Sequence, residues 1–86
     1  MINAKKAQDL TEKYYESKTN VNGYLLEIDK LIEKAAQRGS TYIAYDFGKL
    51  DLSISEMNYA KRKVSEALHN YGYSIVNDLF SIEVHW

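Results

Sequence analysis

The chain contains no cysteine, no proline and only four glycines among its 86 residues. Without cysteine it can form no disulfide, no thiolate nucleophile and no cysteine metal site. Without proline or a low-complexity tract, a long disordered linker is not expected. Because the chain is also well below the roughly 150 residues of an ordinary domain, residues 1–86 are predicted to fold as a single domain.

Neither sign of charge dominates, because eleven basic residues balance twelve acidic ones and the net charge is −1. No overall field therefore steers the protein toward duplex nucleic acid or an anionic membrane, and neither partner is expected. No apolar run reaches the roughly 18 residues of a membrane-spanning helix. The first residues, MINAKKAQDL, lack the apolar stretch of a signal peptide, so a cytoplasmic location is expected.

The familiar catalytic signatures are missing from the sequence. It has no glycine-rich phosphate loop, no helix with paired histidines and no set of serine, histidine and aspartate. His69 lies near the end of a predicted helix, where a cation suits the helix dipole, and His85 lies on the polar side of a predicted strand. No catalytic residue, metal ligand or cofactor is predicted, and the protein is expected to be non-enzymatic.

Two helices are predicted before the first strand. Asn3 can cap the first helix, which begins at Ala4 and has a weak apolar face. This face comprises Ala7, Leu10 and Tyr14. The polar segment 16–22 then interrupts the pattern, and Thr19 or Asn20 can cap a second helix. The pattern leaves open whether the two helices are continuous.

The second helix has the clearest periodicity in the chain. Steps of three and four residues define one apolar stripe, which comprises Val21, Tyr24, Leu25, Ile28, Leu31, Ile32, Ala35 and Ala36. Gly39 fits the residue that follows a helix in the left-handed conformation, and Lys34 and Arg38 lie near the negative helix end. The helix is therefore predicted to end at this glycine.

The third helix is predicted to begin at a capping box formed by Ser53 and Glu56 and to end at Gly72. Its buried side is expected to comprise Ile54, Met57, Val64, Ala67, Leu68 and Tyr71. Lys61 interrupts this stripe.

Three strands are predicted around that helix. Residues 41–47 alternate with period two before it, and residues 73–76 and 80–86 follow it, separated by a loop over 77–79 that suits a tight antiparallel hairpin. The alternating apolar residues are Ile43, Tyr45 and Phe47 in the first strand and Phe80, Ile82, Val84 and Trp86 in the last. The predicted fold class is α+β, with helices on one face of a small, largely antiparallel three-stranded sheet.

Eight tyrosines are the one anomaly of the composition, and protein interfaces use this residue heavily. Three of them lie on apolar stripes and are expected in the core, namely Tyr24, Tyr45 and Tyr71. Four others lie off the stripes and are candidates for partner contact, namely Tyr15, Tyr42, Tyr59 and Tyr73. The alternative for these four is that they cover sheet edges and helix flanks.

The only basic run is formed by Lys61, Arg62 and Lys63, and it shares a helix with Tyr59. Basic residues beside aromatic rings can clamp phosphates and stack a base. They can equally form a solvated helix face with cations toward its C-terminal half. Arg62 and Lys63 therefore join the four tyrosines as predicted partner-binding residues.

Four segments together contain most of the predicted helix caps, apolar stripes and strands: INAKKAQDL, LLEIDKLIEKAAQRGSTYIAY, LHNYGYSIV and SIEVHW. The characteristic features are a helix that ends in AA-x-x-G before a strand and a GY-x-I entry into a hairpin. Together they resemble a pattern common in small proteins encoded by tailed bacteriophages. That group includes host-takeover inhibitors, counter-defence proteins that bind a host protein or sequester a nucleotide signal, and minor virion proteins.

The leading hypothesis is therefore a non-enzymatic phage binding protein that neutralises a host factor by occlusion. A nucleotide-sequestering protein with a pocket between subunits, or a minor virion structural protein, are the alternatives. A chain this short buries only about 60 to 65% of the surface that its unfolded form exposes, so a homo-oligomer is expected in each case.

Overall fold

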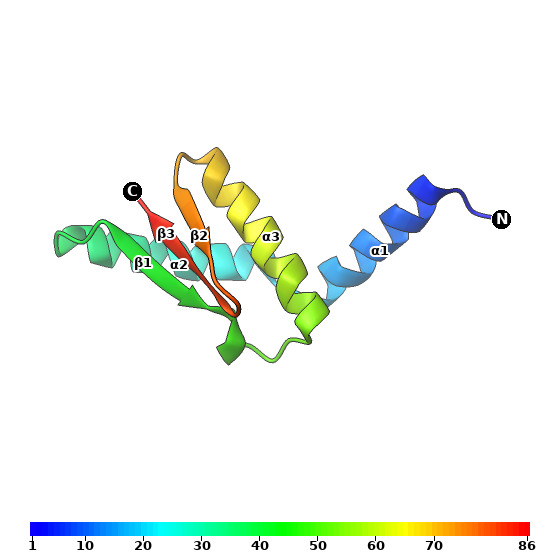
Figure 1. Cartoon of the computed structure of the whole chain (residues 1–86), viewed down its shortest axis with the longest axis horizontal. Helices are drawn as coiled ribbons and strands as arrows, with labels where there is room; N and C mark the ends of the chain where they lie inside the picture. Colours follow the sequence, from blue (N-terminus) through cyan, green and yellow to red (C-terminus); the bar gives the residue numbers. More distant parts are fainter.

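The elements follow the order helix, helix, strand, helix, strand, strand in a computed structural model that describes all of residues 1–86 (Figure 1). Their bounds are α1 Ala4–Lys18, α2 Val21–Gln37, β1 Tyr42–Asp46, the short 3-10 helix η1 Phe47–Lys49, α3 Ile54–Asn70, β2 Ser74–Asn77 and β3 Ser81–His85. The predicted α+β class and the predicted order of elements are confirmed.

Side chains cap each helix where the sequence predicted caps. Asn3 and Asn20 each accept a hydrogen bond from the backbone amide three residues later, at 2.9 and 3.1 Å. Ser53 and Glu56 form the reciprocal capping box of α3. Thr19, just before Asn20, has an extended backbone. The first two helices are therefore separate, which answers the question that the sequence pattern left open.

Glycines end the two helices that lead into strands. Gly39 follows α2 with φ +83° and Gly72 follows α3 with φ +97°. This left-handed conformation is costly for residues that carry a Cβ atom, whereas glycine adopts it freely. Each glycine lets the chain reverse from a helix into a strand of the sheet.

The three strands form an antiparallel sheet in the order β1-β3-β2. The hairpin strands β2 and β3 are neighbours, and β3 also pairs with β1, so β3 is central. Val84 lies opposite both Ile43 and Ile75, which places apolar side chains of all three strands on one face. That face receives the helices.

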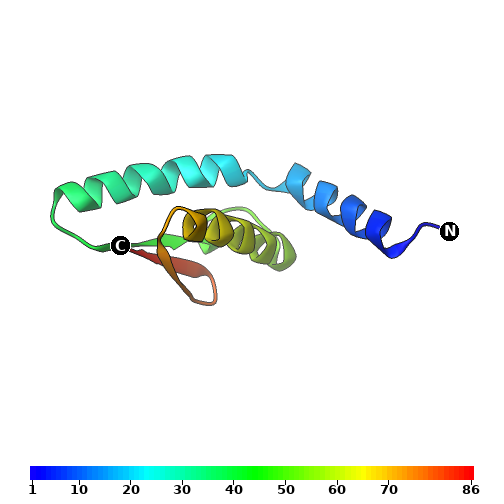
Figure 2. The ribbon, with the colours of Figure 1, turned by 90° about the horizontal axis from the view of Figure 1, so that it is seen from above.

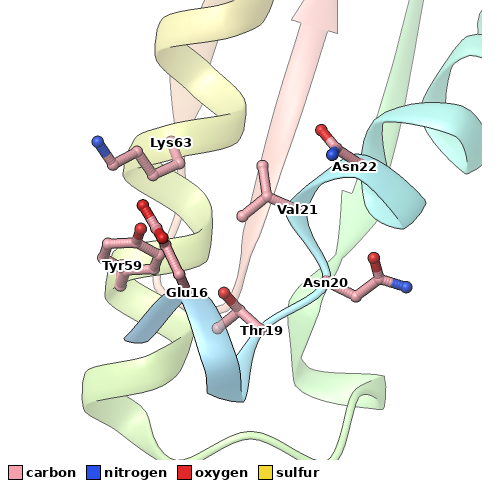
Figure 3. Close-up of a pocket in the computed structure, with 7 residues that line it drawn as sticks. All are labelled: Glu16, Thr19, Asn20, Val21, Asn22, Tyr59 and Lys63. Atoms are coloured by element: carbon pink, nitrogen blue, oxygen red, sulfur yellow. The ribbon is translucent and has the colours of Figure 1, made fainter. Parts of the chain in front are cut away.

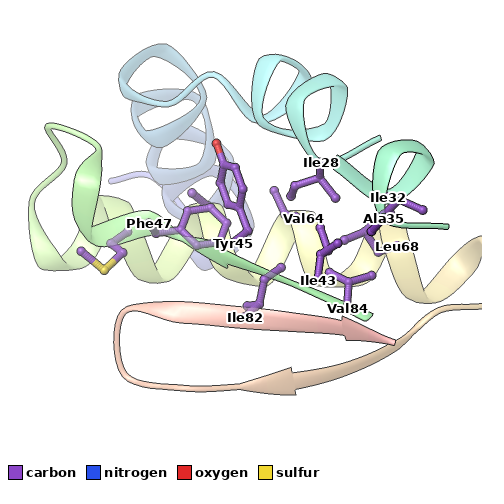
Figure 4. Close-up of a cluster of buried hydrophobic side chains, with 12 residues drawn as sticks. Ile28, Ile32, Ala35, Ile43, Tyr45, Phe47, Val64, Leu68, Ile82 and Val84 are labelled. Atoms are coloured by element: carbon purple, nitrogen blue, oxygen red, sulfur yellow. The ribbon is translucent and has the colours of Figure 1, made fainter. Parts of the chain in front are cut away.

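The core lies between this face of the sheet and the helices α2 and α3 (Figure 4). Its twelve buried residues are Ile28, Ile32, Ala35, Ile43, Tyr45, Phe47, Met57, Ala60, Val64, Leu68, Ile82 and Val84. The Tyr45 hydroxyl donates a hydrogen bond of 2.7 Å to Glu27 Oε2. Burial, and then this carboxylate, raise the pKa of Tyr45 well above its ordinary value.

Several residues of the predicted stripes are exposed, contrary to expectation. Tyr71 is 84% exposed, and Ile54, Leu31 and Ala36 are also exposed. The cause at both ends of α3 is length: its 17 residues span about 25 Å, because a helix rises 1.5 Å per residue. The five residues of β3 span only about 17 Å. Periodicity continues along the helix after the sheet beneath it has ended.

Helix α1 projects from the body that α2, α3 and the sheet form (Figures 1 and 2). It contains no buried residue. The molecule measures 55 × 26 × 20 Å, and its radius of gyration is 14.5 Å. A compact chain of this length would have a radius of gyration of about 12 Å. The difference arises because α1 extends beyond the body and contacts α3 through its C-terminal half, at Glu12 and Tyr15.

Candidate functional site

The six predicted contact residues lie in three places. Tyr15, Tyr59, Arg62 and Lys63 meet where α1 contacts α3. Tyr42 lies on the open face of the sheet, and Tyr73 lies at a groove between α2 and α3. The six residues therefore do not form one surface.

Aromatic stacking joins α1 to α3. The rings of Tyr15 and Tyr59 are stacked with centroids 5.3 Å apart and planes inclined by 20°. The Arg62 guanidinium lies 5.5 Å and the Lys63 ammonium 5.8 Å from the centroid of the Tyr59 ring. Tyr59 is only 7% exposed. Its expected position off the buried face is therefore wrong, because α1 covers a side of α3 that the stripe of α3 does not mark.

The contact of α1 with α3, called the junction below, is also held by the charge of Glu12. Its carboxylate lies 3.3 Å from the Lys63 ammonium and 3.4 Å from the Arg62 guanidinium. The Tyr59 hydroxyl donates a long hydrogen bond of 3.5 Å to it. Sequence reasoning missed Glu12, since its partners lie about fifty residues away along the chain. The spacing of three residues between Glu12 and Tyr15, which puts both on one helix face, was the available signal.

The charges at the junction are reflected in two pKa shifts. Partial desolvation raises the pKa of Glu12, but hydrogen bonds and ion pairs with Lys63, and then Arg62, outweigh it and lower this pKa below its ordinary value. Burial, followed by the charge of Glu12, raises the pKa of Tyr59. Both basic side chains of the predicted site are thus engaged within the molecule.

A polar cleft of about 500 Å³ lies beside the junction, at the link between α1 and α2 (Figure 3). It is lined by Glu16, Thr19, Asn20, Val21, Asn22, Tyr59 and Lys63. Figure 3 shows Glu16, Tyr59 and Lys63 grouped on one side of this link. The single cation of the cleft therefore lies with an acidic side chain, which disfavours an anionic ligand.

Replacing Glu12 with glutamine is expected to loosen α1 from α3, because the variant keeps the side chain's shape but loses its charge. In the wild type, the lowered pKa of Glu12 stabilises the docked helix above the ordinary pKa of glutamate. This stabilisation is lost as the pH falls through the lowered value. We expect backbone amides of α1 to exchange several-fold faster in Glu12→Gln at neutral pH, measured by hydrogen exchange.

Glu16→Gln is the matched control, since Glu16 is on the same helix but makes no ion pair. It should exchange like the wild type and keep the acid-induced loosening, whereas Glu12→Gln should lose it. Equal acid response in both variants would show that the Glu12 charge does not hold the junction.

The open face of the sheet carries a second group of polar and aromatic side chains. The rings of Tyr42 and His85 are stacked with centroids 5.2 Å apart. His85 Nε2 lies 2.9 Å from Glu83 Oε1. No helix covers these residues, because α2 and α3 both pack on the opposite face. Antiparallel sheets commonly leave such a face to water.

An apolar groove of about 580 Å³ runs between α2 and the C-terminal end of α3. It is lined by Asn22, Leu25, Leu26, Asp29, Ile32, Leu68, Tyr71 and Tyr73. Trp86 continues the apolar surface, as its ring meets Tyr73 edge-on with centroids 6.3 Å apart. The groove thus places the exposed side chains of Leu26 and Tyr71 beside the edge of the core at Ile32 and Leu68.

The apolar stripe of α1 is also uncovered. Leu10 and Tyr14 are about half exposed, and Ala7 lies one turn before them. Because successive helical residues turn by about 100°, Ala7 and Glu12 point about 140° apart around the axis. The stripe therefore faces away from α3 while Glu12 and Tyr15 face toward it.

No group of three or more histidine, aspartate or glutamate side chains is placed to hold a metal ion. None of the helices is both long and apolar enough to cross a membrane.

No protein-family model matches the chain, and neither a curated protein nor a solved structure shows significant similarity to it.

Proposed function

We propose that this chain is a non-enzymatic protein-binding module that presents the apolar stripe of α1 to a partner protein and acts by occlusion. One observation carries the proposal: α1 extends from the body without a buried residue and turns Leu10 and Tyr14 away from it. An amphipathic helix held in this way matches helix-in-groove recognition, in which residues on one helix face anchor in a groove.

The junction with α3 supports this role, because it holds α1 at a defined angle, as an arm that projects from the body. The stacked pair Tyr15 and Tyr59 and the ion pairs of Glu12 restrain α1 before any partner binds. Such restraint lowers the entropy cost of association. In this proposal the predicted residues Tyr15, Tyr59 and Lys63 act by positioning the arm.

Nucleotide sequestration receives less support from the site. Arg62 and Lys63 both pair with Glu12, and Glu16 lines the neighbouring cleft. A phosphate at this position would have to displace the Glu12 carboxylate from the two cations and would meet a second carboxylate. The charge distribution therefore favours a protein partner.

The resemblance to small phage proteins supports a host factor as the target, encountered in the host cytoplasm and neutralised by steric covering. The size of the chain suits this role, since occlusion requires only a preorganised surface with a few apolar anchors.

Native mass spectrometry after incubation in host lysate tests the proposal with two variants. Leu10→Glu places a charge on the stripe, and Gln8→Glu places the same charge on the same helix about 120° from its centre. We expect one defined complex with the wild type and Gln8→Glu, and its loss with Leu10→Glu. Retention of that complex by Leu10→Glu, or a bound mass of a few hundred daltons in place of a protein, would contradict the proposal.

A further inference from the structure

We infer that a second copy of this chain covers the stripe of α1, with the arm of each copy lying in the groove between α2 and α3 of the other. The inference rests on the proposed function, because it names a partner for the same stripe. It concerns only self-association, which can fail while the stripe still binds another protein.

An exchange of arms, in which each copy places its α1 in the groove of the other, fits the large exposed surface area of the chain. The chain exposes 6132 Å², whereas a compact monomer of 10.0 kDa exposes about 5,200 Å². The excess of about 900 Å² is close to the roughly 800 Å² per partner that a stable protein interface buries. An arm and a groove on each copy offer two equivalent contacts about a two-fold axis.

The two surfaces are chemically alike. Leu10 and Tyr14 lie one turn apart on the arm, and the groove is lined mainly by apolar and aromatic side chains. Leu26, on the wall of the groove, is 65% exposed, and Tyr71 is more exposed still. Seating the arm would cover both residues together with the stripe.

The charges beside these surfaces are complementary. Lys6 and Lys13 flank the stripe on one side at helical spacing, and neither makes an ion pair. Asp29 lines the groove, and Glu33 follows it one turn later on the same helix; both are exposed and unpaired. A basic flank thus meets an acidic rim, which favours this pairing over others.

The same charges disfavour direct pairing of two arms. In an antiparallel pair centred between Asp9 and Leu10, the basic flanks would face each other and place Lys6 opposite Lys13 of the second copy. Like charges in such positions are destabilising. The groove is therefore the better site for the arm.

The arm cannot reach the groove of its own chain. Tyr59 and Arg62 hold α1 against the N-terminal half of α3, whereas Leu68 and Tyr71 place the groove at the opposite end of that helix. The stripe also points away from α3. Only another copy can supply the groove, and a host factor that binds the stripe would compete with that copy.

Sedimentation analysis of two exposed-leucine variants tests the exchange. Leu10→Glu alters the arm, and Leu26→Glu alters the groove. Leu79→Glu is the control, because Leu79 is 73% exposed and lies in the hairpin loop outside both surfaces. We expect a wild-type dimer, an equal dimer for the control, and dimerisation weakened at least about 100-fold in each of the other two.

Mixing the two defective variants gives the decisive result. The intact arm of Leu26→Glu can enter the intact groove of Leu10→Glu, so the mixture should form a heterodimer although neither variant forms a homodimer. Circular dichroism should show that both variants keep the wild-type helix content, since both leucines are exposed.

A monomeric wild type, a Leu26→Glu variant that dimerises normally, or a mixture that stays monomeric would each overturn the exchange. If the wild type is monomeric but Leu10→Glu still loses its lysate complex, the exchange fails while the proposed function stands. If Leu10→Glu changes neither self-association nor the lysate complex, both fail.

Discussion

Phe47→Ala is expected to destabilise the protein by about 3–5 kcal/mol, the usual cost of removing a buried phenylalanine ring. Phe47 is fully buried, and its ring packs edge-on against Tyr45 and Tyr24, with centroids 5.0 and 6.1 Å away. A chain of this length has a total stability of about 4–13 kcal/mol. The variant should therefore lose much of its stability, and its thermal midpoint should fall by more than about 10 °C.

Phe80→Ala is the matched control, because it removes the only other phenylalanine of the chain. Phe80 is 47% exposed, so its replacement should cost less than about 1.5 kcal/mol. Urea denaturation of both variants measures the difference. Equal destabilisation by the two replacements would show that Phe47 does not anchor the core as the structure indicates.

Lys61→Ala is expected to cost about 2–3 kcal/mol, more than a surface lysine contributes. Lys61 is buried, and its ammonium donates hydrogen bonds to the backbone carbonyls of Asp78 and Leu79, the second at 3.3 Å. These bonds tie α3 to the loop of the β2–β3 hairpin. Beyond the loss of stability measured by urea denaturation, we expect faster hydrogen exchange in the hairpin.

Two further variants divide the effect of Lys61 into its parts. Lys61→Met keeps an unbranched apolar stem and should recover the packing contribution but not the hydrogen bonds. Lys63→Ala removes a lysine whose side chain is 32% exposed and whose ion pair with Glu12 lies at the surface, and it should cost less than about 1 kcal/mol. If Lys61→Met is as stable as the wild type, the ammonium contributes nothing to the hairpin.

At Lys61 the sequence pattern predicts burial but not the hydrogen-bond partners. The stripe of α3 predicts that this position faces the core, and the lysine interrupts it. What the pattern could not supply is the acceptor, because two carbonyls from residues 17 and 18 positions later fold over the helix. A buried cation needs such partners.

The candidate site was predictable only in its composition. The sequence pattern groups Tyr59, Arg62 and Lys63 as basic and aromatic residues of one helix, and it marks Tyr15 as a separate contact candidate. Their meeting, and the role of Glu12 as the shared acid, follow from the packing of α1 on α3. Residue type alone also predicts Tyr42 and Tyr73 as contact residues, but Tyr42 lies on the open face of the sheet and Tyr73 lies at the groove between α2 and α3.

Local sequence determined the elements of this protein and their ends. The caps at Asn3, Asn20 and Ser53, and the glycines at positions 39 and 72, act over a few residues, so their effects can be recognised in the sequence. The alternation of apolar residues likewise determined which face of the sheet is buried.

Tertiary structure alone decided which ends of the helices stay exposed, that α1 covers Tyr59, and that its apolar stripe points away from the body. These outcomes depend on where elements distant in the sequence meet and on the unequal lengths of helix and strand. A periodic pattern identifies the apolar face of a helix, but it does not identify what lies against that face.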